Sequence, residues 1–160
     1  MMIVILGMTL SGCNSSKEVE IIQIEPDDLI TMAELDTFLF RDDVQYVDLR
    51  NFNSRYMSGY IEGFENIPFF DYLDYRIFDR NGEYEFSPDQ IVNTREIERL
   101  FNPDKAIFLY ADGCIRSGYL KDVLDYLGYE RVYVLGGFYE YQGEHLIIGT
   151  GDFVFGDMFS

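Results

Sequence analysis

A thiol, a carboxylate and a guanidinium lie close together in the segment Ala111-Asp112-Gly113-Cys114-Ile115-Arg116-Ser117. This segment joins a short apolar run to a run with helical periodicity, so we expect a loop that closes onto a helix N-terminus. Such a loop directs unpaired backbone N–H groups into one small space, where the helix dipole adds to their field. A place of this kind binds anions or stabilises a thiolate, which makes Cys114 and Arg116 the candidate functional residues.

The elements on either side of this segment are expected to hold it in place. Ala106-Ile107-Phe108-Leu109-Tyr110 is a continuous apolar run, typical of a strand covered on both faces of a parallel sheet. After the segment, the apolar residues at i, i+3, i+4 and i+7 predict a helix face: Leu120, Val123, Leu124 and Leu127. Gly128 then suits a helix C-cap. In an open α/β sheet the loop would lie at the carboxyl end of a strand, where ligands usually bind.

Three other segments carry patterns that belong with this loop. Val44 to Arg50 predicts a second strand, which ends in Asp48-Leu49-Arg50. In Gly59-Tyr60-Ile61-Glu62-Gly63-Phe64-Glu65-Asn66-Ile67-Pro68 the glycines mark tight turns, and the last three residues predict a third strand and its exit. Val132-Tyr133-Val134-Leu135-Gly136-Gly137 predicts the last strand and a turn. These four segments, in this order, resemble the rhodanese-like domain family over about residues 29–141.

The resemblance implies an α/β fold: a single rhodanese-like domain with a central parallel sheet of about five strands and helices on both faces. The domain is expected over residues 26–145, followed by a C-terminal extension over residues 146–160 to which no structure is assigned. Because Asp48 and Arg50 match a pair that is mainly structural in the family, we expect a buried ion pair rather than a catalytic one. Tyr60 replaces a histidine of the family and Phe64 an alanine, and a structural hydrogen bond is expected to survive through the Tyr60 hydroxyl.

The chain departs from the family at the position that matters most for activity. The family's loop runs Cys-x-x-x-x-Arg-Ser after a strand that ends in tyrosine, and its cysteine carries sulfur as a persulfide. Tyr110 and Arg116-Ser117 fit this frame, which places Ala111 at the nucleophile position. Cys114 follows three residues later, where the family usually has glycine. Phosphatases with a longer Cys-x-x-x-x-x-Arg loop would need a cysteine at position 110, which Tyr110 excludes.

The N-terminus resembles that of a bacterial lipoprotein. Residues 1–10 are almost wholly apolar, and residues 1–12 carry no charge. The segment Leu10-Ser11-Gly12-Cys13 resembles the lipobox, whose cysteine is acylated and becomes the new N-terminus. The run is too short to span a bilayer, which needs about 20 helical residues. We therefore expect a signal peptide over residues 1–12, lipidation at Cys13 and a tether over residues 13–25. A buried N-terminal strand is the alternative.

Composition limits the partners of this chain. It has a net charge of −17, and 48% of its 160 residues are hydrophobic, as in a globular domain. An acidic surface repels nucleic acid and anionic headgroups, so we expect no nucleic-acid partner and a membrane contact only through the lipid anchor, on the extracytoplasmic face. His145 is the only histidine and has no neighbour at ligand spacing, so we expect neither a metal nor a cofactor.

The remaining segments give weaker signals. Thr31 and Glu34 have capping-box spacing, which predicts a helix through about Phe40, and Asn93 can cap another helix over residues 94–101. Residues 69–86 are rich in aromatic side chains without a clear period, among them Tyr72, Tyr75, Phe78 and Tyr84. We expect a loop packed by its own aromatic residues, with a ligand-binding rim as the alternative and a small hairpin at Asn81-Gly82.

Two functional hypotheses follow from the loop, beside the possibility that Cys114 is an exposed cysteine without a role. In the first, the chain is a surface-anchored, non-catalytic module that binds a small anion, a sulfur compound or a surface protein at residues 111–117, with Arg116 holding the anion. In the second, Cys114 carries sulfur or acts as a redox thiol, because the helix N-terminus and Arg116 would increase its thiolate fraction. The direction of the Cys114 sulfur relative to the loop amides distinguishes these hypotheses.

Overall fold

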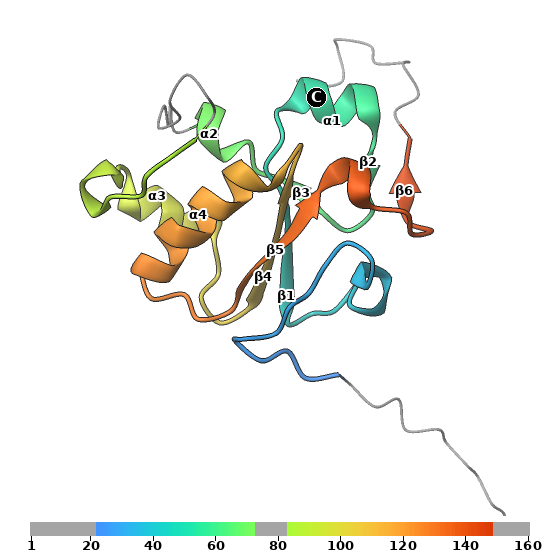
Figure 1. Ribbon diagram of the computed structural model, residues 1–160, viewed down its shortest axis with the longest axis horizontal. Helices are drawn as coiled ribbons and strands as arrows, with labels where there is room; N and C mark the ends of the chain where they lie inside the picture. The colour runs from blue at the N-terminus through green and yellow to red at the C-terminus, as the bar shows by residue number, and fades with distance from the viewer. Residues whose placement is uncertain (1–21, 73–82, 149–160) are drawn as a thin grey trace, which may run out of the picture.

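A parallel sheet of four strands forms the centre of the molecule. The computed structural model describes residues 22–72 and 83–148 (Figure 1). Its strands are β1 (Val44–Asp48), β3 (Glu65–Asn66), β4 (Ala106–Ala111) and β5 (Val132–Gly137), in the spatial order β3-β1-β4-β5. All three neighbouring pairs are parallel, so the carboxyl ends of the strands meet at one edge. The predicted α/β fold is confirmed, with four parallel strands among the described residues where about five were expected.

Helices cover both faces of this sheet. On one face lie α2 (Phe69–Tyr72), α3 (Thr94–Leu100) and α4 (Cys114–Tyr126), with the short 3₁₀ turn η2 (Pro88–Gln90) (Figure 1). On the other face lie the 3₁₀ turns η1 (Leu35–Thr37) and η3 (Phe138–Glu140). The helix α1 (Phe52–Ser58) lies close to the carboxyl ends of the strands and buries none of its own residues. The sheet therefore separates two hydrophobic cores.

Strand β4 supplies side chains to both cores, which explains its continuous apolar sequence. Every residue from Ala106 to Ala111 is buried. Ile107, Leu109 and Ala111 pack on the α4 side, whereas Ala106, Phe108 and Tyr110 pack on the opposite side. The period of two follows from the pleat of the strand. Tyr110 and Ala111, though adjacent in sequence, therefore belong to different environments.

The helix expected from Thr31 through about Phe40 is wrong. Only η1 forms there, flanked by turns, although the side chain of Glu34 accepts from the Thr31 hydroxyl at 3.3 Å. Phe40 has φ of 62°, outside the helical region. The Asp36 carboxylate is held at 2.6 Å by the hydroxyl of Tyr141, which lies on a distant part of the chain. Tertiary contacts thus override the local helix signal.

The other helix predictions are confirmed with small changes at their ends. Helix α3 begins after Asn93, whose backbone is left-handed (φ 57°) and whose side chain makes no capping hydrogen bond. Helix α4 carries the expected apolar face, but it begins at Cys114 rather than after Ser117. Gly128 follows it with φ of 91°, as a C-terminal glycine should.

A small antiparallel sheet joins the end of the described chain to the domain. Strand β6 (Leu146–Ile147), in the region expected as an extension, pairs with β2 (Tyr60–Ile61). The amide of Glu62 also donates to the carbonyl of His145 at 2.8 Å. At the other end of the domain, Ile24 is already buried in the second core, inside the region expected to be a tether.

Some expectations concern residues outside the described ones. They are the signal peptide, lipidation at Cys13, the hairpin at Asn81-Gly82 and the contacts of Tyr75 and Phe78. Within residues 22–72 and 83–148, no helix combines the length and the apolar character needed to cross a membrane.

We predict that Gly59→Ala weakens the fold more than Gly128→Ala does. Both glycines have positive φ, 85° and 91°, so each alanine costs about 1–2 kcal/mol of backbone strain. At Gly59, the added Cβ would also collide with the carbonyl oxygen of Ile147, whereas at Gly128 it meets nothing within 4 Å. Urea unfolding of both variants measures the difference. Equal losses of stability would show that the contact between β2 and β6 does not constrain Gly59.

Candidate functional site

The segment between β4 and α4 is shorter than the sequence predicted. Ala111 ends the strand and Cys114 begins the helix, which leaves Asp112 and Gly113 as the connection. Cys114 to Ser117 thus form the first turn of α4, whose N–H groups have no partner within the helix. Ser117 is buried, and its hydroxyl donates to the Cys114 carbonyl at 3.2 Å. The expected loop of residues 111–117 is therefore a two-residue connection and a helix N-terminus.

The end of β5 packs directly against this connection. A Cβ placed on Gly137 would lie 2.8 Å from the carbonyl oxygen of Asp112 and 3.4 Å from the Cα of Gly113. Only glycine allows this approach without moving the backbone. The connection is consequently held from one side by the neighbouring strand.

Ala111 provides no reactive group at the nucleophile position. Its side chain is fully buried in the core on the α4 side, beside Leu109 and Leu120. A methyl group in this place neither ionises nor carries sulfur. Any covalent chemistry at this end of the sheet would have to come from another residue.

Cys114 is the one sulfur-bearing candidate among the described residues near this position. It is the first residue of α4, it is exposed, and its thiol is free of a disulfide. Its neighbour Ile115 is also half-exposed. The solvent-facing placement of Cys114 is the arrangement that we expected for a binding module or for a cysteine without a role.

Arg116 forms an ion pair with Asp112 on the same surface. The Arg116 Nη1 and Asp112 Oδ2 atoms are 3.7 Å apart, and the two side chains are 42% and 45% exposed. The spacing i, i+4 between opposite charges was visible in the sequence, although the pair itself was not predicted. The positive charge of Arg116 is thus partly compensated before any anion arrives.

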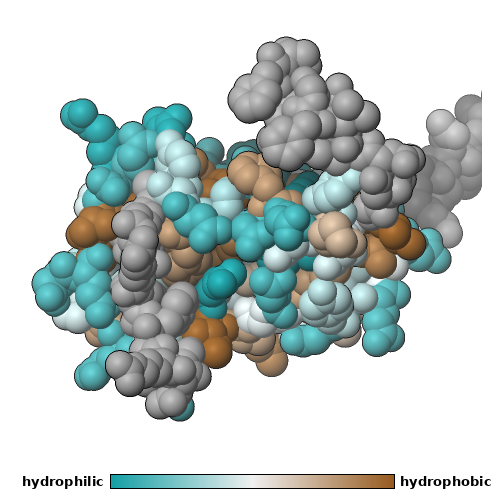
Figure 2. All heavy atoms as spheres, turned by 90° about the horizontal axis from the view of Figure 1, so that it is seen from above, coloured by the Kyte–Doolittle hydropathy of each residue, from teal (hydrophilic) through white to brown (hydrophobic). Residues whose placement is uncertain are grey.

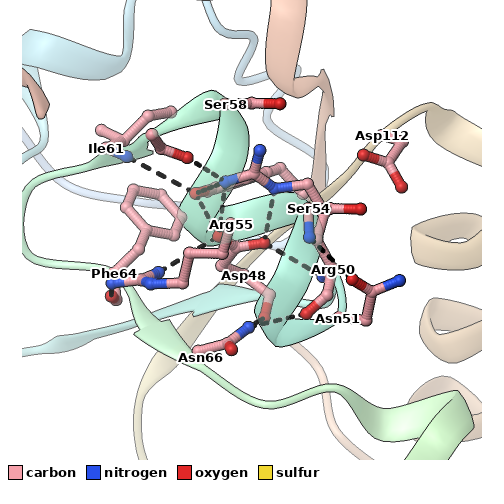
Figure 3. Close-up of polar contacts among 12 residues, drawn as sticks. Asp48, Arg50, Asn51, Ser54, Arg55, Ser58, Ile61, Phe64, Asn66 and Asp112 are labelled. Carbon is pink, nitrogen blue, oxygen red and sulfur yellow. Dashed lines mark hydrogen bonds and ion pairs between the residues drawn. The ribbon is translucent and has the colours of Figure 1, made fainter. Parts of the chain in front are cut away.

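A buried polar network lies beside the connection, on the opposite side of the sheet from Ala111 (Figure 3). Asp48, at the end of β1, accepts hydrogen bonds from Arg50 Nε at 3.0 Å and Arg50 Nη2 at 2.8 Å. Arg55 Nη1 reaches the same carboxylate at 3.1 Å, and the Tyr110 hydroxyl donates to it at 2.7 Å. The expected Asp48–Arg50 pair is therefore present, and both side chains are fully buried. One carboxylate serves two arginines and a tyrosine.

The network extends to the backbone of neighbouring segments. Arg50 Nη2 donates to the Gly59 carbonyl at 2.8 Å, and Arg55 Nη2 donates to the Phe64 carbonyl at 2.9 Å. The Asn66 amide donates to the carbonyl oxygens of Asp48 and Arg50 at 2.9 and 2.7 Å. These bonds fix the chain between β1 and β3 around one buried centre.

Burial and charge decide the protonation of this network. Burial, together with the negative charge and hydrogen bond of Asp48, raises the pKa of the Tyr110 hydroxyl. Burial by itself would lower the pKa of Arg50, but the hydrogen bond and charge of Asp48 outweigh it, and the pKa is raised. Tyr110 therefore remains a donor and Arg50 remains charged.

Aromatic rings complete the surroundings of both arginines. The Arg50 guanidinium lies 3.7 Å from the ring centroid of Phe138, and the Arg55 guanidinium lies 3.9 Å from that of Tyr60. Tyr60 therefore acts through its ring, and the hydrogen bond expected from its hydroxyl is not found among the described residues. Phe64 is buried and contacts the Tyr110 ring edge-on at 4.8 Å. No pattern in the sequence pointed to Arg55 or Phe138, because the fold alone brings Arg55 to Asp48 and Phe138 to Arg50.

Tyr84 and Phe86, from the described part of the aromatic stretch, pack on α4. The ring of Tyr84 meets that of Tyr119 at 5.2 Å, and its hydroxyl donates to Asp122 at 3.0 Å. Burial and the Asp122 hydrogen bond raise the pKa of Tyr84 to about 12. Phe86 also packs against Tyr119, at 6.0 Å. Elsewhere in the domain, the Nδ1 atom of His145 lies 3.3 Å from the Glu62 carboxylate.

Figure 2 shows the end of the molecule where these features lie. Hydrophilic side chains occupy much of its middle, and apolar side chains lie toward its margins. Exposed apolar residues on the elements at this end are Phe52, Met57, Ile115 and Tyr139. Asp112 and Arg116 add two partly exposed charged side chains to these apolar residues.

We predict stability effects of very different size for the two charged sites. Asp48→Asn should lower the free energy of unfolding by about 3–5 kcal/mol, because it leaves two arginines without their buried counter-ion. Arg116→Ala should change it by about 0–1 kcal/mol, since the ion pair with Asp112 is half-exposed. It should nevertheless remove weak binding of a small oxyanion at the helix N-terminus. Urea unfolding and anion titration measure the two effects, and a collapse of Arg116→Ala would make Arg116 a structural residue instead.

Comparison with known proteins agrees with this geometry. The family model for the rhodanese-like domain matches residues 31–144. A crystal structure of a rhodanese-like domain protein from Staphylococcus aureus is 25% identical, with a TM-score of 0.52, over 76% of this chain and 97% of that chain. The crystal structure of a protein from Staphylococcus saprophyticus subsp. saprophyticus is 26% identical, with a TM-score of 0.51, over 75% and 98% of the two chains. The search of curated proteins gave no match.

Proposed function

The chain belongs to the rhodanese-like domain family, and from this premise we propose that it is a non-catalytic module that binds a small anion, a sulfur compound or a surface protein at residues 111–117. The observation that carries the proposal is Ala111, a fully buried methyl group at the family's nucleophile position. A sulfurtransferase of this family needs a thiolate there, and alanine cannot supply one.

Electrostatics supports the same reading. A sulfur donor such as thiosulfate is a dianion, and it would approach a chain with a net charge of −17. The one cation at the helix N-terminus, Arg116, is already paired with Asp112. The site therefore favours a weakly held anion or a polypeptide over a dianionic substrate.

An enzyme that uses Cys114 is the second candidate. Its support is the exposed, free thiol on the first residue of a 13-residue helix, at the positive end of the helix dipole. In this alternative, the Cys114 thiolate would attack the outer sulfur of thiosulfate, release sulfite and keep a persulfide. The exposed position of Cys114 weakens this candidate, since no described group encloses the sulfur.

The deciding experiment measures transfer of sulfur from thiosulfate to cyanide. The natural chain should show negligible activity, and Cys114→Ser should change little. Ala111→Cys should gain weak persulfide formation, because a thiol there would stand before the first-turn amides of α4 and have a pKa below about 8.5. Ala111→Cys combined with Asp112→Arg should do better, because it replaces a repelling charge with an attracting one.

Two results would contradict this ordering. Robust activity of the natural chain that is lost in Cys114→Ser would make Cys114 the catalytic residue. A folded Ala111→Cys variant whose new thiol forms no persulfide and is no more acidic than a free cysteine would show that position 111 is not faced by the amides.

We further propose that the module is held at the extracytoplasmic face of a bacterial membrane by acyl chains on Cys13. The support is the sequence alone: the apolar run before Leu10-Ser11-Gly12-Cys13 and the polar residues after it. The acidic surface of the chain gives no electrostatic attraction to anionic lipids. Attachment would therefore depend on lipidation.

Expression in a bacterium that processes lipoproteins tests this anchor. The protein should partition into detergent and incorporate labelled fatty acid, and Cys13→Ala should abolish both. Cys114→Ser provides the matched control, because it removes the other cysteine and should leave labelling unchanged. A soluble natural protein that retains Met1 would contradict the proposal.

A further inference from the structure

The buried network around Asp48 carries more positive than negative charge. The Asp48 carboxylate is the acceptor for two guanidiniums, those of Arg50 and Arg55. Tyr110 is neutral, because its pKa is raised. Arg50 and Asp48 are fully buried, and the Arg55 side chain is 18% exposed. An uncompensated charge away from water is costly, so this centre favours one additional anion.

One nitrogen of this network has no hydrogen-bond partner. Arg50 Nη1 is buried and meets no acceptor, whereas Nε and Nη2 of the same guanidinium are bonded to Asp48 and Gly59. In Figure 3 the terminal nitrogen without a dashed line points away from Asp48, on the side where Ser58 lies. Buried charged donors without a hydrogen-bond partner are rare in folded proteins, so we expect an oxygen acceptor to bind here.

A hydrogen bond joins two segments that are next in sequence to partners of Arg50. The hydroxyls of Ser58, at the end of α1, and Tyr139, in η3, lie 3.0 Å apart. Gly59, next to Ser58, accepts from Arg50, and Phe138, next to Tyr139, stacks on the Arg50 guanidinium at 3.7 Å. Tyr139 itself is 72% exposed. The Ser58–Tyr139 bond thus joins the two segments that hold Arg50 between them.

We propose that Arg50 Nη1 is the anchor of a second anion site, which a small monoanionic oxyanion such as a carboxylate occupies when the Ser58–Tyr139 hydrogen bond opens. This site is separate from the one proposed at Arg116. Arg50 lies with the core on the opposite side of the sheet from Ala111, and it is not exposed at the surface in the closed arrangement.

The charge of the network selects the class of ligand. Two arginines against one carboxylate leave an excess of one positive charge, which a monoanion neutralises and a dianion would reverse. The two hydrogens on Nη1 can meet one or two oxygens of a carboxylate, as guanidiniums commonly do. Acetate should therefore bind better than sulfate or thiosulfate.

Nitrogen-edited NMR of the arginine side chains tests this site in the full chain. We use the Arg116→Ala background, in which the other anion site is removed, and titrate with acetate, sulfate or thiosulfate at matched ionic strength. The Arg50 resonances should shift saturably with acetate. Tyr139→Phe should lower the apparent Kd about threefold, since an exposed hydrogen bond contributes only a small net free energy.

Two control variants separate the hydrogen bond from other effects of substitution. Ser58→Ala removes the same bond from the other side and should match Tyr139→Phe. Tyr126→Phe removes a hydroxyl from another exposed tyrosine, on α4, and should leave the titration unchanged. None of these three residues belongs to the buried network, so each variant should fold.

Three results would overturn the proposal. The first is an Arg50 resonance that does not shift with acetate in any variant, even if acetate binds at Arg116 in the natural chain. The second is contact of the Nη1 hydrogens with a water molecule that acetate does not displace, which would make water the missing acceptor. The third is equal or tighter binding of the dianions, which would contradict the charge argument. Failure at Arg50 leaves binding at Arg116 unaffected, so the two proposals are distinguishable.

Discussion

The Asp48 carboxylate is the centre on which the described domain depends. It is hydrogen-bonded to side chains from the segment after its own strand, from α1 and from β4. Through Arg50 it is linked to the carbonyl before β2 and to the Phe138 ring after β5. A buried ion pair of this kind stabilises a protein only while all its partners are in place. The network therefore specifies one arrangement of the segments at the carboxyl ends of the strands, and it does so without exposed ionic contacts.

Two aromatic replacements fit around this centre. Tyr60 stacks on Arg55, and Phe64 fills the space against Tyr46 and Tyr110. An aromatic face attracts a cation without competing for its hydrogen-bond donors, so Arg55 can still bind Asp48 and the Phe64 carbonyl. The absence of an ionisable histidine at position 60 is thus compatible with a fully organised network.

The sequence predicted the fold well and the site only in part. The run from Ala106 to Tyr110 was predictable because a strand buried on both faces is apolar throughout. The apolar face of α4 was predictable because a helix packed on a sheet carries apolar residues at helical spacing. The segment after Thr31 was not, because Asp36 and Phe40 take their conformations from contacts with residues far along the chain. Likewise Arg55 meets Asp48, and Phe138 meets Arg50, only through the topology, and no spacing in the sequence connects these pairs. The departure at Ala111 was visible because it is a change of residue type within a fixed motif.

The alternation along β4 separates the frame of this domain from its chemistry. Tyr110 faces the network and Ala111 faces the other core, so adjacent positions of one strand have different surroundings. A change of side chain at position 111 alters the packing against α4 but does not remove the hydrogen bond between Tyr110 and Asp48. The pleat of a single strand thus lets the residue at the nucleophile position differ while the polar network beside it keeps its partners.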